Sequence, residues 1–244
     1  MHDYTSLKNC LKRNEITVIG DSRARQQTQA MKARYYNTLK FHADKSQEIP
    51  SLPPNLNYQW SKFLNTTEII LENIPPPRDK EHTIILGSNL LWSLRQDVLL
   101  TDEAIINAGK EFQNTFKEKI VPLLIKMSDT GFKFIWMASE LCRDFEIREI
   151  EGINIKVPSP TKSLIATKNQ VMTNLNIFTE KQIKNLKLPG IEFMSSNLAT
   201  AWNLDGTVSL MEDSLHKMTR TEVTPMPISL LIDTSYLFNK ICEN

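Results

Sequence analysis

Residues 16–26 read Ile16-Thr17-Val18-Ile19-Gly20-Asp21-Ser22-Arg23-Ala24-Arg25-Gln26, and this stretch decides the fold. Its first four residues are β-branched and too few for a helix, so they predict a buried strand. Gly20 permits a sharp exit from that strand, and Asp21 or Ser22 can cap a following helix. Small and apolar side chains then recur at steps of three and four, which predicts one face of that helix: Ala24, Thr28, Met31, Tyr35 and Leu39.

The turn between this strand and this helix holds Ser22. At a helix N-terminus, the backbone N–H groups and the helix dipole favour developing negative charge. A nucleophilic serine is stabilised in such a place, so Ser22 is a candidate catalytic residue. The alternative is that Gly-Asp-Ser is ordinary turn chemistry, in which Ser22 only caps the helix.

The rest of the chain alternates short apolar runs with longer segments of helical spacing. Strands are predicted at 82–86, 132–137 and 191–194, and helices at 101–128, 161–187 and 226–242. Such alternation is typical of an α/β fold, in which helices cover both faces of a mainly parallel sheet. Functional residues of such sheets gather at the carboxyl ends of the strands, where Ser22, Gly87–Asn89 and residues 195–197 are expected.

Two regions lack this alternation. Residues 41–80 contain several prolines and are predicted to form an elaborated loop region, with short strands at 57–60 and 68–74. Residues 140–160 are predicted to form a polar connecting loop. No linker composition separates two halves, so we expect residues 1–244 to form a single domain.

The composition disfavours several functional classes. The 29 Lys and Arg against 28 Asp and Glu give a net charge of +1, and no run of five like charges indicates nucleic acid or an anionic membrane as a partner. No apolar run reaches the roughly 20 residues that span a bilayer, and the polar N-terminus does not resemble a signal peptide. The three cysteines form no CxxC pair, so no metal site is predicted and at most one internal disulfide is expected. One glycosylation sequon, Asn65-Thr66-Thr67, matters only in a lumenal compartment.

Of the four histidines, His216 has the most suggestive surroundings. Asp213 precedes it by three residues, just before the last predicted helix. A bond from this carboxylate to the imidazole would fix the tautomer and leave Nε2 to take a proton from a serine hydroxyl. Glu212 is an alternative partner, and Asp-x-x-His alone is most often a pair of surface residues. His82 begins a strand and is predicted to be structural.

Ser22 on the first strand-to-helix turn, together with Asp213-x-x-His216, resembles the SGNH/GDSL hydrolase superfamily. That resemblance implies a flavodoxin-like, three-layer α/β/α fold with the Asp and His on one late loop. The opening residues, Met1-His2-Asp3-Tyr4, Lys8-Asn9-Cys10-Leu11 and 19–26, are further similar to the lumenal catalytic domain of animal sialate O-acetyltransferases. The likeness covers most of the chain, although its specific residues are concentrated in the first 26 and around 213–216.

The resemblance implies transfer of acetyl from acetyl-CoA to a hydroxyl of sialic acid or a related sugar through an acetyl-serine. Ser22 would be the nucleophile, Asp213 the orienting acid and His216 the base. Acetyl-CoA would be a donor substrate, with no bound cofactor. In that family the domain lies in the Golgi lumen, attached to a multi-pass membrane region. The same residues would serve an SGNH-type carbohydrate or lipid esterase, and a non-catalytic binding module is a third interpretation.

Five further residues are candidates for oxyanion or substrate binding: Gly87, Asn89, Arg23, Arg25 and Trp92. Asn89 is similar to the oxyanion asparagine of the superfamily, or it caps a turn. Arg23 or Arg25 would bind an anionic donor or the sialate carboxylate, or both would lie on a solvated helix face. Trp92 would stack on a sugar ring or pack in the core.

The sequence also departs from the family pattern. No glycine lies between Gly20 and Gly87, where typical members carry an oxyanion-hole glycine, and Ser214 replaces a glycine beside the late histidine. The predicted oxyanion hole therefore differs from that of typical members of the superfamily.

Overall fold

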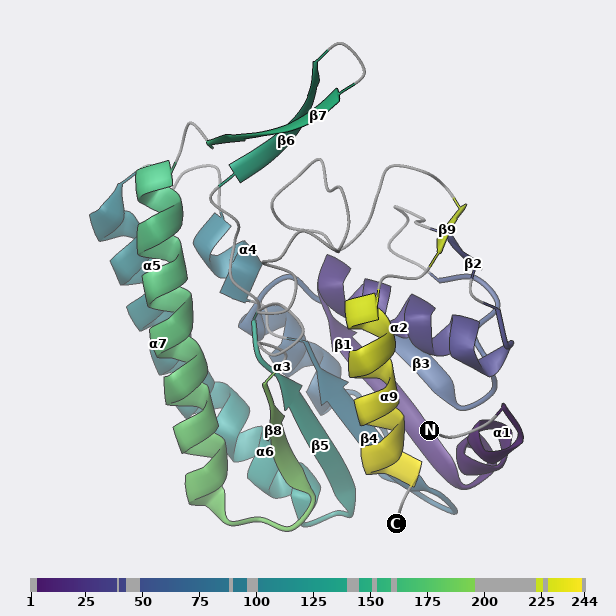
Figure 1. Ribbon diagram of the computed structural model, residues 1–244. Helices are drawn as coiled ribbons and strands as arrows, with labels where there is room; N and C mark the ends of the chain where they lie inside the picture. The colour runs from purple at the N-terminus through teal and green to yellow at the C-terminus, as the bar shows by residue number, and fades with distance from the viewer. Residues whose placement is uncertain are drawn as a thin grey trace.

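The centre of the molecule is a parallel sheet. The computed structural model of the chain describes residues 4–38, 40–42, 49–87, 90–95, 101–139, 145–150, 153–158, 162–195, 223–225 and 228–242. Within these residues, five parallel strands lie in the order β3-β1-β4-β5-β8, as Figure 1 shows. Their bounds, in the same order, are Leu56–Trp60, Asn14–Gly20, Glu81–Leu86, Phe132–Met137 and Ile191–Met194. Counted along the chain, these strands have the flavodoxin-like order 2-1-3-4-5. The predicted α/β fold is confirmed.

The central strands are apolar because both of their faces are covered. β1 and β4 are buried along most of their length, as expected for parallel strands rich in Ile and Val. Their register places Ile19 opposite Leu86. Residues that follow β1 and β4 therefore meet at one edge of the sheet. The strand order reverses between these two strands, and ligands of open α/β sheets bind at such a switch point.

Helices cover the sheet on both faces (Figure 1). One face packs against the helices nearest the two ends of the chain: α1 (Tyr4–Arg13), α2 (Ser22–Tyr35) and α9 (Ile228–Cys242). The other face packs against the helices between them: α3 (Leu64–Glu72), α4 (Leu90–Arg95), α5 (Asp102–Thr115), α6 (Val121–Ser128) and α7 (Lys162–Leu186). The edge-on contact of Phe116 with Trp136, with ring centroids 5.0 Å apart, lies in this second core. The three-layer arrangement agrees with the prediction.

The helix predicted over 101–128 forms, but it contains a π-helical turn at Phe116–Ile120 between α5 and α6. There the N–H of Val121 donates to the carbonyl of Phe116. Pro122 follows immediately, and a proline in a regular helix has no N–H and clashes with the carbonyl four residues before it. The wider turn accommodates the ring, so Pro122 is tolerated within this helical region by a π-bulge just before it.

The segment 68–74 was predicted to be a strand, and this prediction is wrong. It lies in α3 and the turn after it, and Leu64, Thr67 and Leu71 form the buried side of this helix. Their spacing of three and four is helical, but Ile69 and Ile70 beside them are β-branched, which favours a strand. The strand predicted at 57–60 is confirmed as β3.

The polar loop predicted at 140–160 is also wrong in part. It contains β6 (Phe145–Ile150) and β7 (Ile153–Pro158), which form an antiparallel pair. Apolar residues alternate with charged ones over 145–148, and two adjacent charged residues, Arg148 and Glu149, then interrupt this strand pattern. Figure 1 shows this hairpin projecting beyond the central sheet. A second small pair joins β2 (Lys40–His42) to β9 (Val223–Pro225).

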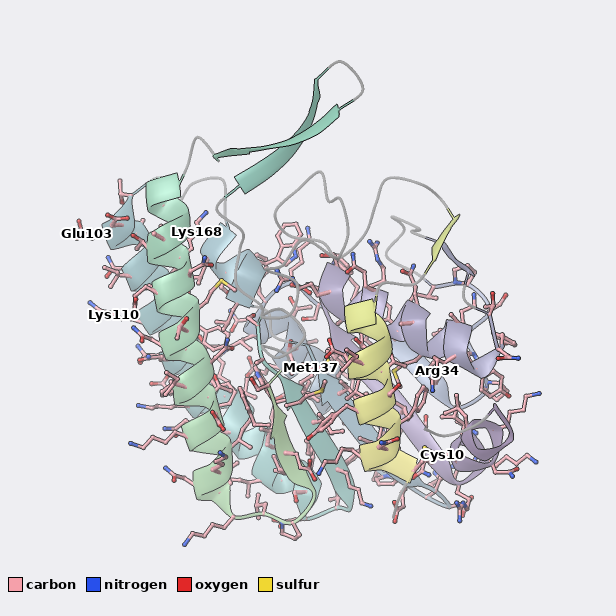
Figure 2. All side chains as sticks on the ribbon, in the orientation of Figure 1. Cys10, Arg34, Glu103, Lys110, Met137 and Lys168 are labelled. Atoms are coloured by element: carbon pink, nitrogen blue, oxygen red, sulfur yellow. A yellow bond between two sulfur atoms is a disulfide. The ribbon has the colours of Figure 1, made fainter. Side chains whose placement is uncertain are left out.

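A disulfide joins Cys10 of α1 to Cys242 of α9, across 232 positions of sequence. Figure 2 shows Cys10 beside the C-terminal end of α9. From three cysteines we expected at most one internal disulfide, but the sequence did not indicate which two cysteines form it. The third cysteine, Cys142, lies outside the described residues. No helix in the described part of the chain has the length and apolar character needed to cross a membrane.

Candidate functional site

Ser22 is the first residue of α2, directly beyond the carboxyl end of β1. Asp21 caps this helix, because its Oδ1 accepts a hydrogen bond from the N–H of Arg23 at 2.9 Å. The alternative in which Ser22 is itself the N-cap residue is therefore wrong. Ser22 is buried, with 5% of its surface exposed, and Asp21 is fully buried. The turn thus places a serine at a helix N-terminus on the switch-point edge of the sheet.

Two glycines allow the helix to begin so close to the sheet. A Cβ on Gly20 would lie 2.6 Å from the Cβ of Ala24, and a Cβ on Gly87 would lie 2.7 Å from the same atom. The N–H of Gly87 donates to the carbonyl of Ile19 at 2.7 Å. The N–H of Gly87 is therefore engaged in the hydrogen bond to Ile19. A side chain at position 87 would collide with Ala24, which explains why a glycine stands there.

Tyr58 of β3 holds the same turn from the side. Its hydroxyl donates to the carbonyls of Gly20 and Asp21, at 3.1 and 3.2 Å, while the N–H of Ser61 donates to Gly20 at 2.9 Å. Burial raises the pKa of Tyr58 well above its usual value, the charge of Asp21 raises it further, and the charge of Arg25 lowers it. The Tyr58 hydroxyl therefore stays protonated and keeps donating to these two carbonyls. Sequence reasoning missed Tyr58, although β3 alternates so that Leu56, Tyr58 and Trp60 share one face.

The two arginines after Ser22 have different surroundings. Arg25 is 8% exposed, and its guanidinium lies 5.8 Å from the centroid of the Trp60 ring. A solvated helix face is therefore wrong for Arg25, whereas Arg23 is half-buried. An arginine stacked on an aromatic ring within a buried turn leaves a fixed positive charge near Ser22.

Trp92 lies on α4, which follows β4, and is half-buried. The ammonium of Lys62 lies 4.3 Å from the centroid of its ring. Lys62 follows β3, so this cation–π contact joins two segments that leave the carboxyl edge of the sheet. One face of the Trp92 ring is thus covered by a lysine.

The remaining predicted site residues, Asn89, Asp213 and His216, lie outside the described residues. The described elements that follow His216 in the chain are β9 and α9. β9 pairs with β2, and Gln27 of α2 donates to the hydroxyl of Thr234 of α9 at 2.6 Å. The two described elements after His216 therefore contact α2, which Ser22 begins, and β2, the strand after it.

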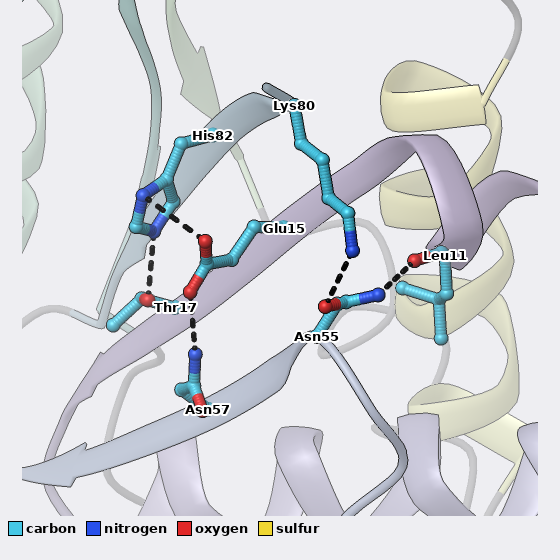
Figure 3. A network of polar contacts seen from close by, with 7 residues as sticks. All are labelled: Leu11, Glu15, Thr17, Asn55, Asn57, Lys80 and His82. Atoms are coloured by element: carbon cyan, nitrogen blue, oxygen red, sulfur yellow. Dashed lines mark hydrogen bonds and ion pairs between the residues drawn. The ribbon is translucent and has the colours of Figure 1, made fainter. Parts of the chain in front are cut away.

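His82 lies away from this site, near the amino ends of the strands, as Figure 3 shows. Its Nε2 lies 2.8 Å from the hydroxyl of Thr17, and its Nδ1 lies 3.9 Å from a carboxylate oxygen of Glu15. The other oxygen of Glu15 accepts from Asn57 at 3.0 Å. Burial lowers the pKa of His82 below its usual 6.5, and the Glu15 carboxylate opposes this shift. These contacts account for His82 as a buried structural residue, as predicted. Within the described part of the chain, no cluster of three His, Cys, Asp or Glu could hold a metal ion.

No family model and no curated protein sequence matches this chain. Among solved structures, the chain is similar to an extracellular lipase from Streptomyces rimosus, at 11% identity and a TM-score of 0.47, over 91% of this chain and 99% of that one. It is similar to a phospholipase A1 from Streptomyces albidoflavus, at 12% identity and a TM-score of 0.49, over 90% and 98%. It is also similar to an acetylxylan esterase from Geobacillus stearothermophilus, at 15% identity and a TM-score of 0.45, over 93% of both chains. The fold class itself rests on the order and direction of the strands in the central sheet.

Proposed function

We propose that this chain is an acyl-transfer enzyme in which Ser22 carries an acetyl group from acetyl-CoA to a hydroxyl of sialic acid or a related sugar. One observation carries the proposal: Ser22 begins α2 at the switch point of the sheet, while the capping bond is made by Asp21. The helix N-terminus is a place where a developing oxyanion is stabilised. The resemblance of residues 19–26 and 213–216 to the sialate O-acetyltransferases supplies the substrates.

In this mechanism His216, oriented by Asp213, takes the proton of Ser22 as its Oγ attacks the acetyl carbonyl. The carbon–sulfur bond of the thioester breaks, and coenzyme A leaves with that proton. The sugar hydroxyl then attacks the acetyl-serine, gives its proton to His216 and releases Ser22. The N–H of Ser22 and the side chain of Asn89 would meet the oxyanion, each donor contributing about 3 kcal/mol.

The basic residues beside Ser22 suit two anionic substrates. Arg23, half-buried, would bind a phosphate of acetyl-CoA or the carboxylate of the sialate. Arg25, held near Trp60, would act as a fixed charge that strengthens this attraction. The Lys62–Trp92 pair lies at the same edge and would contact the acceptor sugar. The proposed location is the Golgi lumen, with the domain attached to a multi-pass membrane region.

Water can replace the sugar as acceptor, and the protein would then be a carbohydrate or lipid esterase with the same three residues. The test incubates the purified chain with acetyl-CoA, with and without a sialoside, and measures free coenzyme A, acetate and O-acetylated sialoside. We expect O-acetylated sialoside from the wild type, and at least a ~10³-fold loss for Ser22→Ala and for His216→Ala. Ser128→Ala, which changes a half-buried serine at the end of α6, is the matched control and keeps full activity.

The products separate the alternatives. Acetate without acetylated sialoside would replace the transferase with the esterase. If the protein turns over neither acetyl-CoA nor simple acetyl esters, the proposed enzyme is wrong and the remaining interpretation is a non-catalytic binding module on the same fold.

A further inference from the structure

We propose that Asn65 carries an N-linked oligosaccharide and that its first sugar occupies the hollow beside the start of α3. Asn65-Thr66-Thr67 is the single N-x-Ser/Thr sequence in the chain, and its middle residue is not proline. The proposed acyl-transfer site does not use this motif.

The start of α3 presents the acceptor asparagine outward. Leu64 and Thr67 are buried, whereas Asn65 and Thr66 between them are exposed. The hydroxyl of Thr67 pairs with the hydroxyl of Ser61 at 2.9 Å, which anchors this first turn in the folded protein. A glycan can therefore be attached to Asn65 without disturbing a buried contact.

A hollow of about 460 Å³ adjoins Asn65, between α3, α4 and α5. Its volume lies in the roughly 300–1,000 Å³ range of small-ligand sites. The half-buried ring of Phe63 and the methyl group of Ala108 give it apolar surface. The exposed side chains of Asn107 and Glu111 supply an amide and a carboxylate. A pyranose with an N-acetyl group has matching surfaces: C–H faces for the ring, and hydroxyl and amide groups for the polar side chains.

Phe63 is placed to contact the first sugar, because it precedes Asn65 by two residues and lines the same hollow. Its backbone carbonyl accepts from the N–H of Thr67 at 3.0 Å, so the residue is held at the start of the helix. This packing would bury apolar surface that the bare protein leaves partly exposed, which predicts that the attached sugar stabilises the fold.

The disulfide supplies independent support for the compartment in which this modification occurs. Cys10–Cys242 joins the first and last described helices, and disulfides persist in oxidising compartments such as the lumen of the secretory pathway. The donor there is an oligosaccharide linked through pyrophosphate to a lipid. Asn65 Nδ2 forms a bond to the anomeric carbon, the bond from that carbon to the pyrophosphate oxygen breaks, and the amide proton leaves.

The test expresses the full chain behind a secretory signal in a eukaryotic cell and treats it with a peptide N-glycosidase. We expect a mobility shift that the glycosidase removes, with Asp at position 65 by mass spectrometry of the released peptide. Asn65→Gln abolishes the shift. Asn73→Gln, which changes an exposed asparagine just after the same helix and outside any sequon, retains it. An unmodified wild-type protein, or a shift that survives Asn65→Gln, would overturn the proposal.

Thermal unfolding tests whether the first sugar lies in this hollow. Trimming the glycan to its first sugar is expected to preserve the Tm, and complete removal to lower it by about 2–4 °C. In Phe63→Ala this loss on removal disappears, because the packing surface is gone. An equal loss in Phe63→Ala would show that the sugar does not lie in this hollow. The proposal is independent of the acyl-transfer activity, so either one can fail without the other.

Discussion

At the scale of single residues, the turn around Ser22 was largely predictable and its support was not. A strand, a glycine and an Asx cap are local features, so residues 16–26 indicate the turn directly. Tyr58 bonds to the same turn from 37 or more positions along the chain, and a single sequence has no local signal for such a contact. The positions of Asp213, His216 and Asn89 relative to Ser22 remain predictions.

Tyr58→Phe removes the hydroxyl that the carbonyls of Gly20 and Asp21 share. We expect about a 10-fold fall in kcat with little change in KM, because the hydroxyl positions Ser22 and does not contact substrate. We also expect a loss of ~1 kcal/mol in the free energy of unfolding. Steady-state kinetics and denaturant unfolding measure both. Tyr236→Phe, at a tyrosine on α9 that is 41% exposed, is the control and changes neither.

His82 predicts how stability depends on pH. Its pKa in the folded protein is lower than 6.5, so the unfolded chain binds more protons as the pH falls through this range. The stability that neutral His82 contributes to the folded protein is therefore complete above about pH 6.5, and it is lost as the pH falls from there through the folded pKa. Denaturant unfolding from pH 7.5 to 5 should show falling stability, and His82→Gln should flatten that slope. An unchanged slope in the variant would assign the effect to other groups.

At the scale of elements, periodicity predicted the strands and helices that have one dominant pattern. It failed at α3 and at the β6–β7 hairpin, where local composition conflicted with spacing. It also could not show that α2 is buried on nearly all sides, since its buried residues include Gln26, Gln27 and Gln29. These polar residues are accommodated because α2 lies between the sheet and α9, as the Gln27–Thr234 bond illustrates.

The close approach of α2 to the sheet predicts a compensated pair of substitutions. Gly87→Ala places a Cβ 2.7 Å from the Cβ of Ala24, which should cost about 1–3 kcal/mol of stability and displace Ser22. Adding Ala24→Gly removes the Cβ of residue 24, with which the new Cβ collides. The double variant should recover part of the activity that Gly87→Ala loses, and the contact of the new Cβ with the carbonyl of Ile19, at 3.3 Å, limits full recovery. Activity that is the same in both variants would contradict this packing.

At the scale of the whole molecule, the alternation of strands and helices was enough to predict a parallel sheet covered on both faces. It could not choose which cysteines pair, because three cysteines allow several pairs and only the fold brings Cys10 to Cys242. That disulfide joins α1 to α9, the two helices nearest the chain ends, on the same face of the sheet as α2.

Closing so long a loop restricts the unfolded chain strongly. We expect the double variant Cys10→Ser/Cys242→Ser to lose about 5–6 kcal/mol of unfolding free energy by the loop-entropy relation, because the cross-linked residues are 232 positions apart. Reduction of the wild type should produce the same loss, measured by denaturant unfolding with and without a thiol reductant. Equal stability of the oxidised and reduced proteins would show that this cross-link contributes nothing to the fold.

The most direct measurement is peptide mass spectrometry of the protein quenched with acid after incubation with isotopically labelled acetyl-CoA in the absence of a sugar. We expect a labelled acetyl group on Ser22 in the wild type, and we expect it to be discharged when a sialoside is added before the quench. The label should be absent from Ser22→Ala and strongly reduced in His216→Ala. A wild-type protein that never acquires the label on Ser22 while it turns over acetyl-CoA would contradict the assignment of this serine as the nucleophile.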